Sequence, residues 1–178
     1  MYTFRRMLKA STLAAFSAAV LVSTAQEQVK LGKAITEVSL AKFDLIAEPS
    51  GTGFPAGSGT AQQGRTIFEN RCAACHGSNG EGNSDATVLV GGNMQSAATP
   101  LRTVGSYWPY ASTVFDFIRR AMPANAPKSL TDEETYQVAA YVLYLNGLVA
   151  EDEIMNAQTL PQVRMPNAEG FLDQSHIQ

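Results

Sequence analysis

Cys72-Ala73-Ala74-Cys75-His76 places two thiols three residues apart, with an imidazole directly after the second. On one helical turn both thiols can reach the vinyl groups on adjacent edges of a single porphyrin, and the histidine then lies beneath the ring with a nitrogen on the iron. The motif therefore predicts that Cys72 and Cys75 attach one haem c covalently and that His76 is an axial ligand.

Other uses of this cysteine pair fit the rest of the chain less well. A thioredoxin-like redox pair needs a βαβ setting, and no strand pattern precedes Cys72. A structural zinc site needs four ligands, whereas the sequence offers two cysteines and one further histidine, His176. A disulfide between Cys72 and Cys75 is possible, but it leaves His76 and the long loop after it unexplained.

The segments on both sides of the motif are predicted to be helical. Upstream, Thr60 and Gln63 can form a capping box, and apolar residues then recur at helical spacing. Downstream, residues 112–120 have an apolar face, and residues 131–146 begin with a capping box and three acids. The loop that starts at residues 77–93 is too long to be organised by its own side chains, as expected where a buried prosthetic group organises it.

The sixth ligand of the iron decides whether the haem only transfers electrons or also reacts with a substrate. A protein ligand at this position excludes substrates from the iron, whereas an open position admits them. The candidates beyond the motif are Met94, Met122, Met155, Met165 and His176. We predict Met122, which follows an apolar-faced helix and precedes Pro123 in a connection of limited freedom; a thioether opposite histidine favours Fe(II). Core filling is the alternative for any of these methionines, and His176 is expected to be a solvated tail residue.

The N-terminal residues 1–25 are typical of an export signal. They carry three basic residues and no acid, then a short apolar run and small residues before a cleavage site near Ala25-Gln26; an uncleaved membrane anchor is the alternative. Cleavage leaves 10 basic against 16 acidic residues and changes the formal charge from -3 to -6. We therefore expect a periplasmic protein with no membrane anchor, which binds a protein partner rather than nucleic acid.

The remaining chain divides into three parts. An arm, residues 26–56, could hold one short helix from Thr36 and ends in a segment rich in Gly, Pro and Ser. Residues 57–149 form the haem domain. The tail, residues 150–178, is interrupted by prolines and a glycine and is expected to lie over the surface.

Several separated blocks resemble class I cytochromes c. They are C-A-A-C-H, G-R-T-I-F before it, A-M-P after it, and the T-D-E-E helix that ends in A-A-Y-V-L-Y-L. The resemblance implies an all-α fold around one haem, with the first and last helices crossing near Gly64, Phe68 and Tyr141. It also implies that a proline carbonyl accepts the N–H of His76, and Pro100 in T-P-L matches that proline.

A narrower resemblance covers most of the mature chain. The run T-V-G-S-Y-W-P-Y-A-S-T-V-F-D-F-I-R-R-A-M-P is similar to the cytochrome subunits of molybdenum sulfite dehydrogenases and Sox-type sulfane dehydrogenases, as are F-P-A-G-S-G-T-A-Q-Q-G and V-R-M-P-N-A-E-G-F. Some Sox-type subunits carry two haem domains, but this chain has one C-x-x-C-H. Arg102, Tyr107 and Trp108 lie in the matching loop and could donate hydrogen bonds to the haem propionates.

The resemblance implies an electron-transfer subunit rather than a catalyst by itself. It would accept single electrons from a molybdopterin sulfite or sulfane dehydrogenase and pass them to a second cytochrome or an oxidase. Three alternatives stay open: the acceptor of another enzyme, such as a quinoprotein alcohol dehydrogenase; a haem peroxidase, for which no distal histidine with a nearby arginine is apparent; and a structural subunit whose haem is incidental.

Overall fold

The computed structural model describes residues 32–40, 43–84, 87–96 and 99–172. The chain divides into two units, residues 1–35 and 36–178, and the second holds every helix and strand named below. The predicted export signal, residues 1–25, and His176 lie outside the described residues. In the described ranges, no helix is both long and apolar enough to cross a membrane.

The regular secondary structure described in the second unit is helical, as the all-α prediction expects, apart from one pair of two-residue strands. Its elements are α1 (Glu37–Leu40), β1 (Ser58–Gly59), α2 (Ala61–Arg71), α3 (Ala73–His76), α4 (Ala111–Ala121), α5 (Asp132–Leu145), β2 (Met155–Asn156) and the 3-10 turn η2 (Leu160–Gln162). Both predicted capping boxes form, at Thr60 for α2 and at Thr131 for α5. Each box satisfies backbone N–H groups that a helix start otherwise leaves without a partner.

The central packing is the crossing of α2 and α5, which the resemblance implied and the structure confirms. The rings of Phe68 and Tyr141 lie 5.2 Å apart. Where the helices are closest, a Cβ on Gly64 would overlap the carbonyl oxygen of Gln137. Only a residue without a side chain therefore allows this approach of the two backbones.

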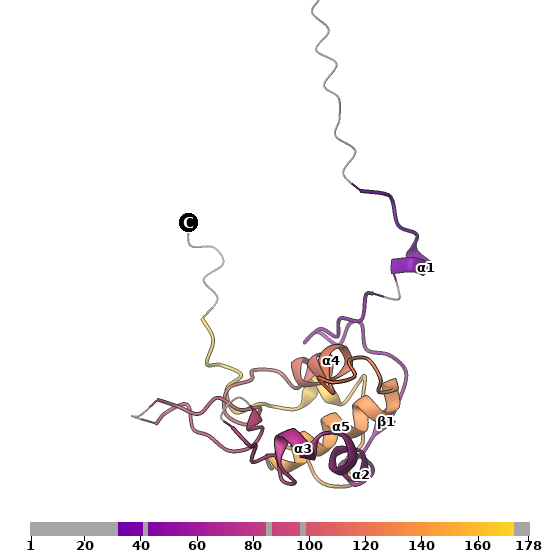
Figure 1. Ribbon diagram of the computed structural model, residues 1–178. Helices are drawn as coiled ribbons and strands as arrows, with labels where there is room; N and C mark the ends of the chain where they lie inside the picture. Colours follow the sequence, from indigo (N-terminus) through magenta and orange to yellow (C-terminus); the bar gives the residue numbers. More distant parts are fainter. Residues whose placement is uncertain (1–31, 41–42, 85–86, 97–98, 173–178) are drawn as a thin grey trace, which may run out of the picture. The chain divides into compact units, whose positions relative to one another are not determined.

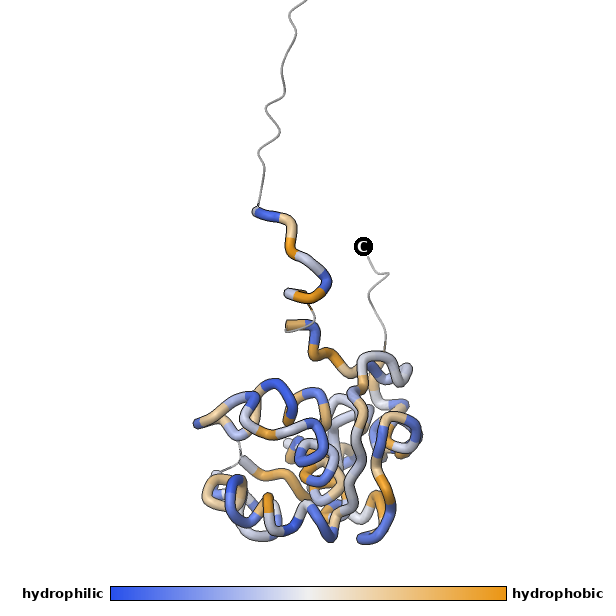
Figure 2. Tube along the Cα trace, turned by 90° about the vertical axis from the view of Figure 1, so that its right-hand side faces the viewer, coloured by the Kyte–Doolittle hydropathy of each residue, from blue (hydrophilic) through white to orange (hydrophobic). Residues whose placement is uncertain are grey.

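Helix α4 covers another side of α5, so that α5 lies between α2 and α4 (Figure 1). The rings of Phe115 in α4 and Tyr136 in α5 are 4.4 Å apart, and Phe54 lies 5.1 Å from Phe115. Hydrophobic stretches of the trace lie toward the inside of this packing and hydrophilic turns toward its outside (Figure 2).

Two residues of the arm, Leu45 and Ala47, are hydrogen-bonded to side chains of α4. The buried carboxylate of Asp116 accepts a hydrogen bond from the backbone N–H of Ala47 at 3.0 Å, and Arg119 donates to the carbonyl of Leu45 at 3.2 Å. Ala47 is itself buried in the core. The end of the arm therefore packs on the helical domain.

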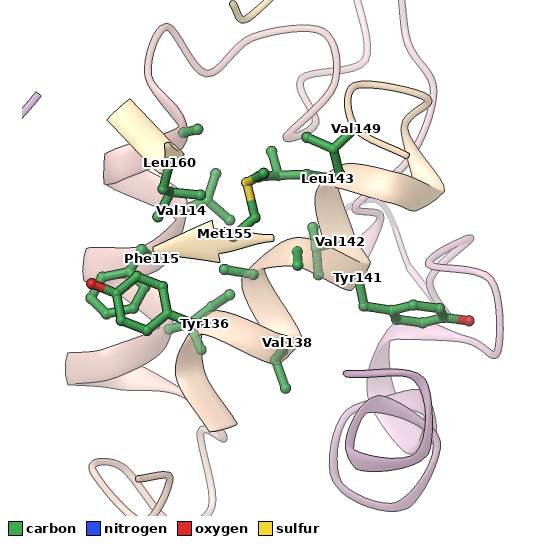
Figure 3. Packing of buried hydrophobic residues seen from close by; sticks show 14 of the residues in the cluster. Val114, Phe115, Tyr136, Val138, Tyr141, Val142, Leu143, Val149, Met155 and Leu160 are labelled. Atoms are coloured by element: carbon green, nitrogen blue, oxygen red, sulfur yellow. The ribbon is translucent and has the colours of Figure 1, made fainter. Parts of the chain in front are cut away.

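The tail differs from its prediction, because three of its residues are part of the core. Strand β2 pairs antiparallel with β1, with Gly59 opposite Met155. Met155, Leu160 and Met165 are each no more than 2% exposed, and Figure 3 shows Met155 between side chains of α4 and α5. The sequence did not predict this burial, because the three residues recur every five positions, a spacing that matches neither a helix nor a strand.

Candidate haem-binding site

The haem motif forms a single turn of helix at the end of α2. Cys72 separates α2 from α3, whose four residues end at His76. The side chain of Cys72 is half-buried and that of Cys75 is exposed, and the two sulfurs are not joined to each other. Burial raises the pKa of the Cys72 thiol to about 11, so this thiol stays protonated at neutral pH until it reacts.

One nitrogen of His76 is already engaged by the protein. Nδ1 lies 2.6 Å from the carbonyl oxygen of Thr87. Since a carbonyl only accepts, Nδ1 carries the proton and Nε2 keeps a free lone pair for a metal. Such a second contact fixes the tautomer and orientation of a metal-binding histidine.

This contact corrects the prediction for Pro100. The carbonyl that accepts the N–H of His76 belongs to Thr87, eleven residues after the histidine, and not to Pro100. The reason lies in the loop after the motif, which turns back at once: Gly82 donates to the carbonyl of His76 at 2.6 Å, and Leu89 donates to Gly80 at 2.8 Å. The turn brings Thr87 to the imidazole before the chain reaches Pro100.

Asn83 and Thr87 are site residues that the sequence interpretation missed. The carboxamide of Asn83 donates to the carbonyls of Ala74 at 2.8 Å and Cys75 at 3.2 Å, inside the haem motif. The backbone N–H of Asn83 donates to the Thr87 hydroxyl at 2.9 Å. The sequence signal for these hydrogen bonds is an asparagine in the Gly-rich loop directly after the motif, because asparagine side chains often hydrogen-bond to nearby backbone groups in such loops.

The loop before α4 brings together two of the three predicted propionate donors. The guanidinium carbon of Arg102 lies 5.0 Å from the centre of the Tyr107 ring. Trp108 instead packs edge-on against Phe117 of α4, with ring centroids 5.7 Å apart. Residues 99–102, which include Pro100 and Arg102, line a cavity of about 520 Å³.

The methionine candidates differ in their packing. Met155 and Met165 are buried in the core, which is the fate expected of most methionines. Met122 follows α4 directly, donates its N–H to the carbonyl of Ile118 at 3.1 Å and is only partly buried. Met94 is partly buried in the loop. Among the described methionines after the motif, Met122 and Met94 are therefore the two whose side chains are not fully buried.

The residues present fit a haem c. Two unpaired thiols lie within one helical turn, and the adjacent imidazole has its second nitrogen held by a carbonyl, as a haem ligand requires. Within the part of the chain that the structure describes, no three His, Cys, Asp or Glu side chains gather as a metal cluster would need.

Comparison with known proteins agrees with this geometry. Residues 59–142 match the family described as cytochrome c oxidase, cbb3-type, subunit III. The structure resembles a chain in the crystal structure of the sulfane dehydrogenase SoxCD from Paracoccus pantotrophus, with a TM-score of 0.76 and 38% identity, over 84% of this chain and 75% of that chain.

Two curated relatives are thiosulfate dehydrogenases. The protein from Allochromatium vinosum is 29% identical over 145 residues, which is 79% of this chain and 50% of the relative. The protein from Psychrobacter arcticus is 30% identical over 103 residues, 54% of this chain and 31% of the relative. The chain thus spans half or less of the length of these two relatives.

Together, the α2–α5 crossing, the C-x-x-C-H turn and these matches show that the chain belongs to the class I c-type cytochromes. Its domain is of the kind that binds haem c. Within that class it is similar to a chain of the SoxCD sulfane dehydrogenase.

Proposed function

We propose that this chain is a periplasmic monohaem cytochrome that transfers single electrons. It accepts them, as a subunit or partner, from a molybdenum sulfite or sulfane dehydrogenase and passes them to a second cytochrome or an oxidase. The single observation that carries the proposal is the C-x-x-C-H turn with Nδ1 of His76 held on Thr87, because this arrangement leaves Nε2 for the iron. The likeness to a SoxCD chain over most of both chains supports the choice of partner.

The bound haem supplies a one-electron couple between Fe(III) and Fe(II). The protein would hold it as follows: Cys72 and Cys75 would attach the porphyrin covalently, and His76 and Met122 would be the ligands of the iron. The Thr87 carbonyl makes the imidazole a stronger electron donor by accepting from Nδ1. Pro100 and Arg102 line the cavity beside residues 99–102. Arg102 and Tyr107, which contact each other, would donate to the propionates, and Trp108 would contact the haem.

The first experiment compares absorption spectra of the haem-loaded protein with those of Met122→Ala and the matched control Met94→Ala. We expect the weak near-infrared sulfur-to-iron band of the oxidised protein to vanish in Met122→Ala only. Reduced Met122→Ala should bind carbon monoxide at once, whereas the wild type should not. A wild type that binds carbon monoxide readily would favour a haem enzyme with an open iron instead.

Covalent attachment has a separate readout. The mass of the denatured chain should exceed that of the mature polypeptide by one haem, and acidified solvent should not extract the cofactor. In a Cys72→Ala, Cys75→Ala double variant the added mass should disappear. An added mass of two haems would contradict the monohaem proposal.

The partner is tested by reduction assays. Oxidised cytochrome is mixed with a molybdenum sulfite dehydrogenase and sulfite, or with a quinoprotein alcohol dehydrogenase and an alcohol, and reduction of the haem is followed. We expect rapid reduction only by the first enzyme. Because two relatives are thiosulfate dehydrogenases, a second candidate function is electron transfer during thiosulfate oxidation, which the same assay with a thiosulfate dehydrogenase and thiosulfate addresses.

A further inference from the structure

The first half of the tail is anchored in the domain. Glu151 forms an ion pair with Arg65 of α2 at 2.6 Å, and its carbonyl accepts from the N–H of Gln62 at 3.1 Å. Beyond β2, Leu160 of η2 is fully buried and η2 packs on α4. Met165 is the last buried residue of this half. These contacts hold the tail against the domain up to Met165, where the last part of the tail begins.

The end of the tail then contacts one short segment of the loop before α4. Arg164 forms an antiparallel bridge with Tyr110. The carboxamide Nδ2 of Asn167 donates to the carbonyl of Tyr107 at 2.7 Å. The ring of Phe171 meets that of Tyr107 edge-on, with centroids 5.2 Å apart. All three contacts fall on the segment that holds two of the proposed haem contacts.

The tail and the loop also border one cavity together. It has a volume of about 280 Å³ and lies between residues 92–95, Gly105, Ser106 and the tail residues Pro166 and Asn167. A separate cavity of about 520 Å³ lies beside residues 99–102. The tail therefore borders the loop from Gly105 to Tyr110.

We propose that tail residues 164–171 act as a clamp on loop 99–110, with Asn167 as its positioning residue. The clamp fixes Tyr107 and Trp108 for the haem. The tail thereby becomes part of the haem pocket rather than an appendage to the domain. The role toward the haem rests on the proposed function, whereas the clamp itself rests only on the contacts above.

Gly170 provides an independent way to open the clamp. A Cβ at this position would overlap Oδ1 of Asn167. The obstacle is the far end of a side chain, so an alanine here would push the carboxamide aside. Gly170→Ala should therefore displace the donor of the Tyr107 hydrogen bond while Asn167 itself stays in the sequence.

The test uses the full-length, haem-loaded protein and the variants Asn167→Ala and Gly170→Ala. Gln158→Ala, which removes an exposed carboxamide from the same tail, is the matched control. Amide exchange of peptides from loop 99–110 reports the clamp directly. The midpoint potential of the haem reports whether a change in the loop reaches the cofactor, because hydrogen bonds and solvent exposure at the haem edge set that potential.

We expect exchange in the peptide that holds Tyr107 to rise about 2- to 10-fold in Asn167→Ala, the range that the loss of one neutral hydrogen bond gives in an opening equilibrium. Gly170→Ala should show the same rise. The midpoint potential should be lower in both variants, because a looser loop admits water to the haem edge and water favours the extra charge of Fe(III). Peptides from α5 and the variant Gln158→Ala should match the wild type. Unchanged exchange around Tyr107 in both Asn167→Ala and Gly170→Ala would overturn the clamp.

The two readouts separate this inference from the proposed function. If loop 99–110 does not contact the haem, the midpoint potential is the same in every variant and in the wild type, while the exchange difference persists. That result would overturn the role of the clamp toward the haem and leave the tail–loop contact standing. If neither the midpoint potential nor the exchange changes in any variant, the clamp fails and the proposed function is unaffected.

Discussion

Nδ1 of His76 lies 2.6 Å from the carbonyl oxygen of Thr87. Thr87 is in turn held by Asn83, whose carboxamide donates to the carbonyls of Ala74 and Cys75. One asparagine therefore joins the haem motif to the segment that orients its histidine. The proximal side of the site is a closed ring of hydrogen bonds within about fifteen residues of chain.

Asn83→Ala opens this ring. We expect the free energy of unfolding to fall by about 1–2 kcal/mol, because two side-chain hydrogen bonds are lost at an exposed position. The backbone N–H of residue 83 still donates to the Thr87 hydroxyl in the variant, but the segment that carries Thr87 is no longer hydrogen-bonded to the haem motif. A less firmly held Thr87 carbonyl should make the imidazole a poorer donor and raise the midpoint potential by up to about 60 mV, the one-electron equivalent of about 1.4 kcal/mol. Potentiometric and denaturant titrations measure both, with Asn79→Ala as control. An unchanged potential would show that Asn83 acts on stability alone.

Gly64→Ala tests the α2–α5 crossing. The new Cβ would overlap the Gln137 carbonyl, a backbone atom that cannot turn aside. We expect the free energy of unfolding to fall by about 2–3 kcal/mol, despite the better helix propensity of alanine. Thr66→Ala, on the exposed side of the same helix, should stay within about 0.5 kcal/mol of the wild type. Urea unfolding of both variants measures these free energies. Equal unfolding midpoints for Gly64→Ala and Thr66→Ala would contradict the close approach of α2 to α5 at Gly64.

Asp116→Ala tests the attachment of the arm. The substitution leaves the buried N–H of Ala47 without its acceptor and removes the partner of Arg120. The expected loss in the free energy of unfolding is about 2–3 kcal/mol, with faster amide exchange at residues 45–48. Asp116→Asn keeps an acceptor for Ala47 and should lose less, and Asp152→Ala is the exposed control. Exchange at Ala47 that stays slow in Asp116→Ala would argue against this anchor.

Ionisation of Tyr136 is expected to lower the stability of the domain at alkaline pH. Burial raises the pKa of its phenol to about 12, against about 10 in an unfolded chain. Because the folded pKa is the higher one, the phenol contributes stability that is complete below pH 10 and is lost as the pH rises from 10 to 12. Melting temperatures across this range should fall less steeply in Tyr136→Phe than in the wild type.

The same variant should be less stable at neutral pH. Tyr136→Phe loses the hydrogen bond from its hydroxyl to the carbonyl of Pro55, 2.9 Å long, at a cost of about 1 kcal/mol. Tyr110→Phe, at an exposed phenol, serves as the control and should follow the wild type at every pH. Parallel pH curves for Tyr136→Phe and the wild type would mean that another group sets the alkaline limit.

The sequence by itself determined the haem motif, both capping boxes and the helices they start, and the crossing of α2 and α5 through its resemblance to class I cytochromes. These features depend on side-chain identity at short spacing: a thiol pair, a hydroxyl with a carboxamide or carboxylate three residues on, a glycine at a crossing. Such patterns act locally or carry a family signature, so they are visible before the chain is folded.

Only the tertiary structure decided which carbonyl meets His76 and what the tail does. Every residue has a carbonyl oxygen, so the identity of Thr87 says nothing about its role, and the turn of the loop alone brings it rather than Pro100 to the imidazole. In the tail, Met155, Leu160 and Met165 follow no helical or strand period. Their burial depends on where distant helices leave room, and that is a property of the packed domain.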